Sequence, residues 1–198
     1  QPLFQAGWEK FYPGMIEWKK AADDGKVKKV DPKTMTVYTE FEEHKGGVVN
    51  VIPPQQAGAI AQKAGLADDS GWCPVDQKTF ESTLQKDVYV IGDASIAGAM
   101  PKSGYAANSQ AKVCAAAIAA VVAGQEAPEP SYVNTCYSLV TPDYGISVAA
   151  VYQLKDGKIV SVEGAGGVSP AEASEMQRKQ EAEYARSWFD NVTADIFG

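Results

Sequence analysis

Histidine and basic residues are scarce in this sequence, and long apolar runs are absent. The 18 lysines and arginines stand against 25 aspartates and glutamates, which gives a net charge of -7 and a pI near 4.8. No basic face is expected to neutralise phosphates, which argues against nucleic acid as a partner. The single histidine, His44, excludes a site that needs two imidazoles, and we expect no metal site. No run approaches the roughly 18 apolar residues that cross a bilayer, so we expect no membrane span.

Cysteines are few, and their spacing is wide. Cys73, Cys114 and Cys136 form no CxxC pair, no zinc ribbon and no CxxCH haem-attachment motif. An odd number leaves at least one thiol without a partner in this chain. Cys114 lies among alanines and is expected in the core. The residues around Cys136 favour a buried structural cysteine over a reactive one, and Cys73, between Trp72 and Pro74, is open to both interpretations.

The chain is long and apolar enough to bury a core. It has 198 residues, of which 45% are hydrophobic, and this length is compatible with one large domain or two small ones. The first residue is Gln1, and no charged start followed by an apolar run appears. We therefore expect a processed or truncated product without an initiator or a secretory signal.

Local patterns predict secondary structure along the whole chain. The elements expected before residue 66 are a helix that ends at Pro13, a strand at 15–18, a hairpin of 26–30 and 35–39, and a helix at 55–64. The apolar residues 87–94 (DVYVIGDA) predict a buried strand that runs into a Gly-Asp turn. The elements expected after it are a helix at 105–123, strands at 147–152 and 158–163, a hinge at 164–167 and a last helix capped by Ser169. On that helix a stripe typical of a core face is formed by Tyr184, Trp188, Val192 and Ile196.

Gly92 and Asp93 end the expected strand at the edge where open α/β folds hold ligands. Gly92 permits close approach of a ligand to the backbone, and Asp93 can accept hydrogen bonds from a polyol. Residues 100–105 combine a proline, a lysine, a glycine and a tyrosine before a helix N-terminus, which suits an electron-rich ring or an anion. An ordinary turn and a solvated capping loop account for the same residues.

Together these segments resemble a known family. Residues 88–95 (VYVIGDAS), 100–105 (MPKSGY) and 108–110 (NSQ) look like the FAD-contacting segment of the flavoprotein subunit of flavocytochrome c sulfide dehydrogenase. Further segments that fit are 71–76 (GWCPVD), 131–132 (SY), 134–138 (NTCYS), 144–150 (YGISVAA) and 197–198 (FG). The Asn-Thr-Cys-Tyr-Ser segment is more specific to this family than the Gly-Asp turn is. The Gly-Asp turn occurs throughout two-dinucleotide-domain flavoproteins. Sulfide:quinone oxidoreductases and pyridine nucleotide-disulfide oxidoreductases are related to this family.

The resemblance implies an α/β fold, the C-terminal half of a flavoprotein with two dinucleotide-binding, Rossmann-like domains, followed by a small α+β interface domain. It implies three parts: a remnant of the second nucleotide-binding-like domain (residues 1–66), the C-terminal part of the FAD-binding domain (67–126) and a flavin-binding and interface domain (127–198). The glycine-rich motif for the ADP part of FAD and the cysteine that carries the flavin would lie in an N-terminal half that this chain lacks. That missing half is an implied partner.

FAD is the cofactor that the resemblance implies. The residues that would contact it are Gly92, Asp93, Lys102, Ser103, Gly104 and Tyr105. Cys136 would be catalytic as one half of a redox-active disulfide, with its partner cysteine in the missing N-terminal half. Tyr105 and Trp188 would lie on the route of electrons between flavin and haem.

The implied activity is the oxidation of sulfide to sulfur or polysulfide. Hydrosulfide would attack the disulfide to leave a persulfide on one cysteine, and the released thiolate would pass an electron pair to the flavin. Single electrons would then go to a c-type cytochrome subunit, and this chemistry suits the periplasm. Two alternatives stay open: a sulfide:quinone oxidoreductase, which the charged last helix disfavours, and a non-catalytic module that docks a cytochrome through residues 131–198.

Overall fold

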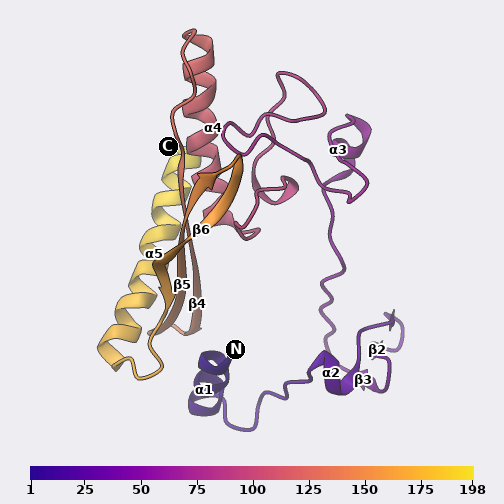
Figure 1. Ribbon diagram of the computed structural model, residues 1–198. Coiled ribbons are helices and arrows are strands. Elements are labelled where there is room, and N and C mark those ends of the chain that lie inside the picture. Colours follow the sequence, from indigo (N-terminus) through magenta and orange to yellow (C-terminus); the bar gives the residue numbers. More distant parts are fainter. The chain divides into compact units, whose positions relative to one another are not determined.

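A computed structural model describes residues 1–198, and the chain separates into two compact units, residues 1–55 and 56–198 (Figure 1). Each unit contains one sheet of three strands, and every pairing between neighbouring strands in both sheets is antiparallel. The chain is therefore mixed α/β, as the sequence predicts at that coarse level. None of its helices combines the length and the apolar character that a bilayer-spanning helix requires.

The first unit combines two short helices with a small sheet. Its elements are α1 Pro2–Phe11, α2 Ala21–Asp24, β1 Lys29–Asp31, β2 Thr36–Tyr38 and β3 Glu43–Lys45. The helix before Pro13 and the hairpin are confirmed, and Val30 lies opposite Val37 in the hairpin. The strand predicted at residues 15–18 is wrong, because no strand pairs with that segment. Trp18 instead packs on Trp8, with the ring centroids 5.8 Å apart.

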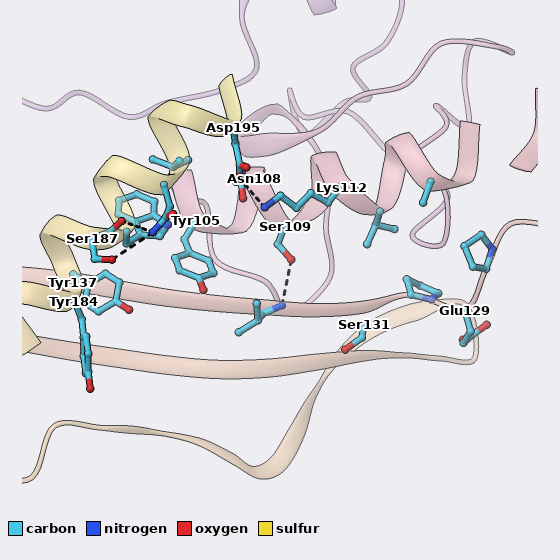
Figure 2. Close-up of a pocket in the computed structure, with 18 residues that line it drawn as sticks. Tyr105, Asn108, Ser109, Lys112, Glu129, Ser131, Tyr137, Tyr184, Ser187 and Asp195 are labelled. Atoms are coloured by element: carbon cyan, nitrogen blue, oxygen red, sulfur yellow. Dashed lines mark hydrogen bonds and ion pairs between the residues drawn. The ribbon is translucent and has the colours of Figure 1, made fainter. Parts of the chain in front are cut away.

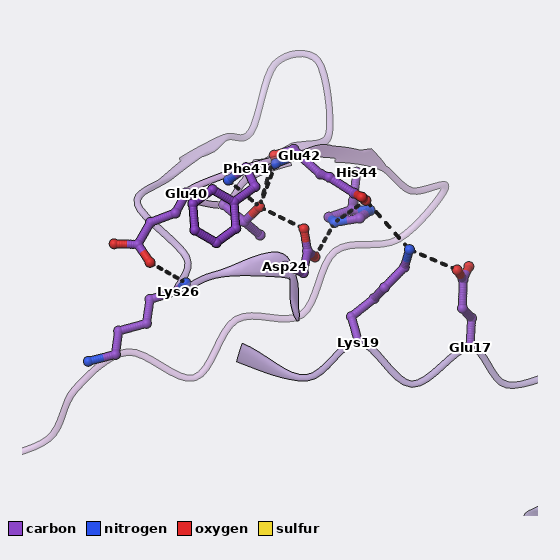
Figure 3. A network of polar contacts seen from close by, with 9 residues as sticks. Glu17, Lys19, Asp24, Lys26, Glu40, Phe41, Glu42 and His44 are labelled. Atoms are coloured by element: carbon purple, nitrogen blue, oxygen red, sulfur yellow. Dashed lines mark hydrogen bonds and ion pairs between the residues drawn. The ribbon is translucent and has the colours of Figure 1, made fainter. Parts of the chain in front are cut away.

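A buried carboxylate joins α2 to the sheet of the first unit (Figure 3). Asp24 is only 4% exposed. Its Oδ1 accepts a hydrogen bond from the Thr39 hydroxyl at 3.0 Å, and its Oδ2 lies 2.6 Å from Nε2 of His44. Around this pair, the ammonium of Lys19 lies 3.5 Å from the carboxylate of Glu42. The network holds the helix against the end of the β2–β3 turn by polar contacts in a unit that buries few apolar side chains.

Replacing Asp24 with asparagine is expected to reduce the acid sensitivity of the first unit. Burial opposes ionisation, but hydrogen bonds from His44 and Thr39 outweigh it and lower the pKa of Asp24. Such a group stabilises the folded state above its unfolded pKa of about 4, and this stabilisation is lost as the pH falls through the lower folded pKa. The difference in melting temperature between wild type and Asp24→Asn should shrink as the pH drops below about 4. A difference that does not change with pH would contradict this, and the exposed neighbour in Asp23→Asn is the control.

The second unit packs two long helices on a three-stranded meander (Figure 1). Its elements are α3 Ala59–Lys63, the 3-10 turn η1 Gly92–Ala94, α4 Gly104–Val122, β4 Ser131–Thr141, β5 Tyr144–Lys155, β6 Lys158–Val168 and α5 Glu175–Phe197. The strand order is β4-β5-β6; α4 contacts β4, and α5 contacts both β4 and β5. The core lies around the fully buried side chains of Phe80, Tyr132 and Ile159. The rings of Phe80 and Tyr132 meet in a T-shaped arrangement with centroids 6.0 Å apart.

Several predicted elements of this unit are confirmed. The helix at 105–123 is α4, which ends just before the positive-φ residue Gly124. The strands at 147–152 and 158–163 are parts of the longer β5 and β6, joined at Asp156 and Gly157, both with positive φ. The helix at 55–64 is shorter and forms α3. The spacing of apolar residues and the residue types at turns are local properties of the sequence. They therefore predict these elements without knowledge of the tertiary structure.

Two other expectations for this unit are wrong, and one strand was missed. Residues 87–94 do not form a strand; Tyr89 makes one isolated antiparallel bridge with Glu81, and the segment then enters η1. The expected hinge at 164–167 lies inside β6, where Gly166 faces Ala149 and Ala150 so closely that a side chain would meet their backbone. β4, which carries Cys136, was not predicted as a strand. An alternating or apolar stretch becomes a strand only when a partner strand lies beside it.

The last helix begins at Glu175, five residues beyond the expected start, with Ser174 as its cap. The hydroxyl of Ser174 accepts a hydrogen bond from the backbone N–H of Gln177 at 3.2 Å. Ser169, the expected cap, has another role. Its hydroxyl donates to the buried carboxylate of Glu181 at 2.7 Å and accepts the N–H of Ser147 at 2.7 Å. It therefore joins β5 to α5 in the interior of the unit.

Serine replacements at these two positions are expected to separate the two roles. Ser169→Ala removes the shortest hydrogen bond to a buried carboxylate and the acceptor of a backbone N–H, so we expect the free energy of unfolding to fall by about 2 kcal/mol. Ser174→Ala removes an exposed cap and is expected to lower it by about 1 kcal/mol. Urea denaturation of both variants measures the difference. A larger loss for Ser174→Ala than for Ser169→Ala would contradict the interior role given to Ser169.

Candidate functional site

Gly92 begins a tight turn that α4 holds in place. Its φ is +71°, in the left-handed region that favours glycine. Its N–H donates to Oε1 of the buried Gln110 at 2.7 Å, and its carbonyl accepts the hydroxyl of Ser95 at 2.8 Å. The next residue, Asp93, is exposed. The turn therefore presents a free carboxylate at a backbone position fixed by a helix, even though no strand leads into it.

Lys102 binds back onto the same turn. Its ammonium donates to the backbone carbonyls of Asp93 and Ser95, the latter at 3.1 Å, and lies 3.7 Å from the centroid of the Trp72 ring. Partial burial lowers the pKa of Lys102, and the nearby carboxylate of Asp93 opposes this shift. The lysine therefore organises the turn as well as supplying a positive charge beside it. A cavity of about 270 Å³ opens here, lined among others by Ser70, Trp72, Gly92, Met100, Lys102 and Gln110.

The N-terminus of α4 follows this turn, and its first residues have different partners. The hydroxyl of Ser103 caps the helix by accepting the N–H of Ala106 at 3.1 Å, and it donates to Oδ1 of Asn134 at 2.6 Å. Both hydrogen-bonding roles of that hydroxyl are thus filled within the protein. Gly104 lies beside Trp188, whose ring is 3.8 Å from the position that a Cβ would occupy, an ordinary van der Waals distance.

The structure brings Tyr105 and Trp188 together, as a pair on α4 and α5. Their rings stack with centroids 5.6 Å apart and an interplanar angle of 15°. Tyr137 on β4 extends the group, with its ring centroid 6.2 Å from that of Trp188, and burial raises its pKa. Sequence reasoning missed Tyr137 because its strand was not predicted.

These three aromatic side chains line a cavity of about 670 Å³ between α4, α5 and the start of β4 (Figure 2). Its polar wall contains an ion pair between Lys112 and Asp195 at 2.7 Å, and the hydrogen bond to Lys112 lowers the pKa of Asp195. The stripe expected as a core face lines this cavity through Tyr184, Trp188 and Val192. Tyr184 is 51% exposed, so the stripe forms the wall of an open groove instead of a packed interior.

Cys136 differs from the other two cysteines in its exposure. All three are free thiols, but Cys73 and Cys114 are buried, and burial raises the pKa of each. Cys114 lies in the core, as predicted. Cys136 is exposed on β4, which contradicts the buried position that its neighbours in sequence favour. Its sulfur accepts a hydrogen bond from Nδ2 of Asn134 at 3.3 Å. An accessible thiol beside a polar donor is the one suited to react.

The first unit contains a group of side chains that could hold a metal ion. The potential ligand atoms of Asp24, Glu42 and His44 all lie within 4.8 Å of one another. In the structure, however, Nε2 of His44 is already engaged by Asp24, and the ammonium of Lys19 lies beside Glu42. The group is satisfied as a hydrogen-bonded network. Sequence reasoning missed it because its members come from separate elements.

Comparison with protein families gives two matches. Residues 1–53 match the family described as sulfide dehydrogenase [flavocytochrome c] flavoprotein chain, central. Residues 128–197 match the family described as flavocytochrome c sulphide dehydrogenase, flavin-binding. The second match includes Cys136, Tyr137 and Trp188, whereas Gly92 and Lys102 lie between the two matched segments. Both descriptions name flavocytochrome c sulfide dehydrogenase.

Proposed function

Because the chain belongs to the flavoprotein chains of flavocytochrome c sulfide dehydrogenase, oxidoreductases that bind flavin and oxidise sulfide, we propose how its residues divide this work. Cys136 takes part in the sulfur chemistry, the turn at Gly92 and Asp93 binds FAD, and Tyr105 with Trp188 forms the exit for electrons. The products are sulfur or polysulfide, and the acceptor is a c-type cytochrome subunit. The observation that carries the proposal is the exposed thiol of Cys136 on β4; Tyr137, the next residue along that strand, points to the opposite face and contacts Trp188.

The residues around the 92–102 turn fit one part of FAD. The exposed carboxylate of Asp93 would accept hydrogen bonds from the ribityl hydroxyls, and Gly92 lets the cofactor approach the backbone. Residues 102–105 would lie against the flavin ring. The cavity of about 270 Å³ is smaller than the roughly 300–1,000 Å³ of sites that enclose a drug-sized ligand, so a second segment would complete the site. When bound, FAD would accept an electron pair and release the electrons one at a time.

The sulfur step needs two cysteines. Hydrosulfide attacks one sulfur of a disulfide, the S–S bond breaks, a persulfide forms on the attacked cysteine and the other leaves as a thiolate. Cys73 and Cys114 are buried, so the partner of Cys136 is proposed to come from the N-terminal half of the flavoprotein. We place this chemistry in the periplasm, where disulfides persist.

The proposed domain division follows from the same membership. Residues 1–66 belong to the second nucleotide-binding-like domain, 67–126 to the FAD-binding domain and 127–198 to the flavin-binding and interface domain. The Rossmann-like sheets of such domains would form when strands of the N-terminal half pair with this chain. In that assembly residues 87–94 gain the neighbouring strands that they lack in the structure of the chain by itself.

A cytochrome-docking role is a second candidate, and the open groove of about 670 Å³ favours it. The groove joins the Tyr105–Trp188 stack to polar side chains on α4 and α5, which suits a protein partner that receives electrons. A cytochrome bound over this groove is compatible with the enzymatic role. It is also the function that would remain if the chain bound no flavin.

Production of the chain alone and together with the N-terminal half tests the proposal. The flavin absorption spectrum is recorded for both, before and after addition of sulfide. Bleaching that requires both halves supports a shared site with Cys136 in the reaction. No flavin and no response to sulfide in either preparation would rule out the enzymatic role and leave the docking role, which binding of a c-type cytochrome to the chain then tests.

A further inference from the structure

A chain of three hydrogen-bonding side chains leads from the N-terminus of α4 to the exposed sulfur on β4. The hydroxyl of Ser103 bonds Oδ1 of Asn134 at 2.6 Å, and Nδ2 of Asn134 bonds Sγ of Cys136 at 3.3 Å. Asn134 is 3% exposed, whereas Cys136 is exposed. A buried amide therefore lies directly beneath an accessible sulfur.

The partners of Ser103 fix which end of the amide faces the sulfur. The hydroxyl of Ser103 accepts the backbone N–H of Ala106, so its single proton is free to be donated. The separation of 2.6 Å lies in the range of O–H···O hydrogen bonds and below that of N–H···O bonds, so the amide atom beside Ser103 is the acceptor, Oδ1 of Asn134. The amide nitrogen, which can only donate, consequently faces Cys136. The sulfur is the acceptor of that hydrogen bond.

A donor in this place forms a stronger hydrogen bond with a sulfur that carries negative charge than with a neutral thiol. Hydrogen bonds to ionised groups are about twice as strong as those between neutral groups, and thiol sulfur is a weak acceptor. The strand keeps the two side chains aligned, since residues two apart in a strand point to the same face. In the β4–β5 pairing, Asn134 lies opposite Ala150 and Cys136 opposite Val148, whose side chains offer no competing hydrogen bond.

We propose that Asn134 is a positioning residue that stabilises the thiolate of Cys136, and that Ser103 orients its amide. The role in catalysis rests on the proposed function. When hydrosulfide attacks the partner sulfur and the S–S bond breaks, the bonding pair stays on Cys136, and the persulfide keeps the proton of the hydrosulfide. The N–H of Asn134 is then aimed at the atom that gains the charge. Cys136 is thereby assigned the place of the leaving sulfur.

Alkylation of the 198-residue chain by iodoacetamide tests this, because it forms a thioether and iodide from the thiolate and needs neither flavin, sulfide nor a second chain. Asn134→Asp keeps the shape and the acceptor for Ser103, removes the donor to the sulfur and adds a carboxylate in its place. We expect alkylation of Cys136, followed by mass spectrometry of its peptide, to slow by about 10-fold or more. The ultraviolet absorbance of the thiolate should fall in parallel. A rate within twofold of wild type would overturn the proposal.

Ser103 provides a second, independent comparison. Ser103→Ala removes the proton that orients the amide, whereas Ser103→Thr keeps a hydroxyl that caps and donates. The alanine variant should be alkylated more slowly at Cys136, and the threonine variant should restore the rate. This pair decides the matter if Asn134→Asp does not fold, and equal rates for the two would overturn the proposal. If the variants are alkylated slowly as expected but the assembled wild-type protein does not oxidise sulfide, the proposed function is refuted and the contact between Asn134 and Cys136 is not.

Discussion

Replacement of Cys136 by serine is expected to reduce the rate of sulfide-driven flavin bleaching in the assembled flavoprotein by at least about 1,000-fold, the scale of loss when a reacting residue is removed. A serine hydroxyl forms no disulfide and so offers hydrosulfide nothing to cleave. The side chain is exposed on β4, so the change creates no cavity and the fold should persist. Stopped-flow absorbance of the flavin after mixing with sulfide measures the rate.

Cys114→Ser is the matched control for this prediction. Its thiol is buried in the core on α4, so the change should lower stability while leaving the rate of bleaching in the folded fraction nearly unchanged. Equal activity of wild type and Cys136→Ser would remove Cys136 from the chemistry. Loss of activity in both variants would instead point to the fold as the cause.

The predictable part of the fold is the part that local sequence determines. The small-residue run before Gly124 predicts α4, and the turn at Asp156 and Gly157 predicts the β5–β6 hairpin. Each of these signals comes from residues that are close together in the sequence. The segment 87–94 shows the limit of such signals. Its apolar residues are typical of a central strand, yet in this chain they have one bridge to Glu81 and no neighbouring strand.

The same limit explains the misplaced start of the last helix. The residues after Ser169 satisfy a capping box, and nothing local distinguishes them from those after Ser174. What decides is the carboxylate of Glu181, which lies twelve positions further along the chain and takes the hydroxyl of Ser169 into the interior. A buried acid needs a donor more than an exposed helix end needs a cap.

The residues of the candidate site were predicted mainly from the family resemblance, and only to a small extent from local sequence patterns. Tyr105 and Trp188 are far apart in sequence, and only the packing of α5 on the sheet brings their rings into a stack. Asn134 and Tyr137 lie in a segment that carries the resemblance but were given no role, since β4 was not predicted and their contacts come from α4 and α5. The exposure of Cys136 was missed for the same reason. Partners fixed by tertiary structure leave no local trace in sequence.

Gly145 controls this packing, and its replacement by alanine is expected to have the largest effect on stability. A Cβ at this position in β5 would lie 2.5 Å from the backbone nitrogen of Ala182 and 2.6 Å from the carbonyl carbon of Glu181. Helix backbone cannot rotate away as a side chain can, so α5 must move off the sheet. We expect the free energy of unfolding to fall by about 3 kcal/mol, near the upper end of the usual range for overpacking.

Displacement of α5 should also separate Trp188 from Tyr105, because the two rings come from α5 and α4 and stack only while α5 contacts the sheet. Near-ultraviolet circular dichroism of Gly145→Ala should therefore lose part of its aromatic signal under conditions where far-ultraviolet spectra show that the helices persist. Gly167→Ala is the matched control, since a Cβ there meets nothing within 4 Å. Its free energy of unfolding, measured by urea denaturation, should stay within about 0.5 kcal/mol of wild type. Equal losses for the two variants would mean that strand entropy, and not contact with α5, sets the requirement for glycine at position 145.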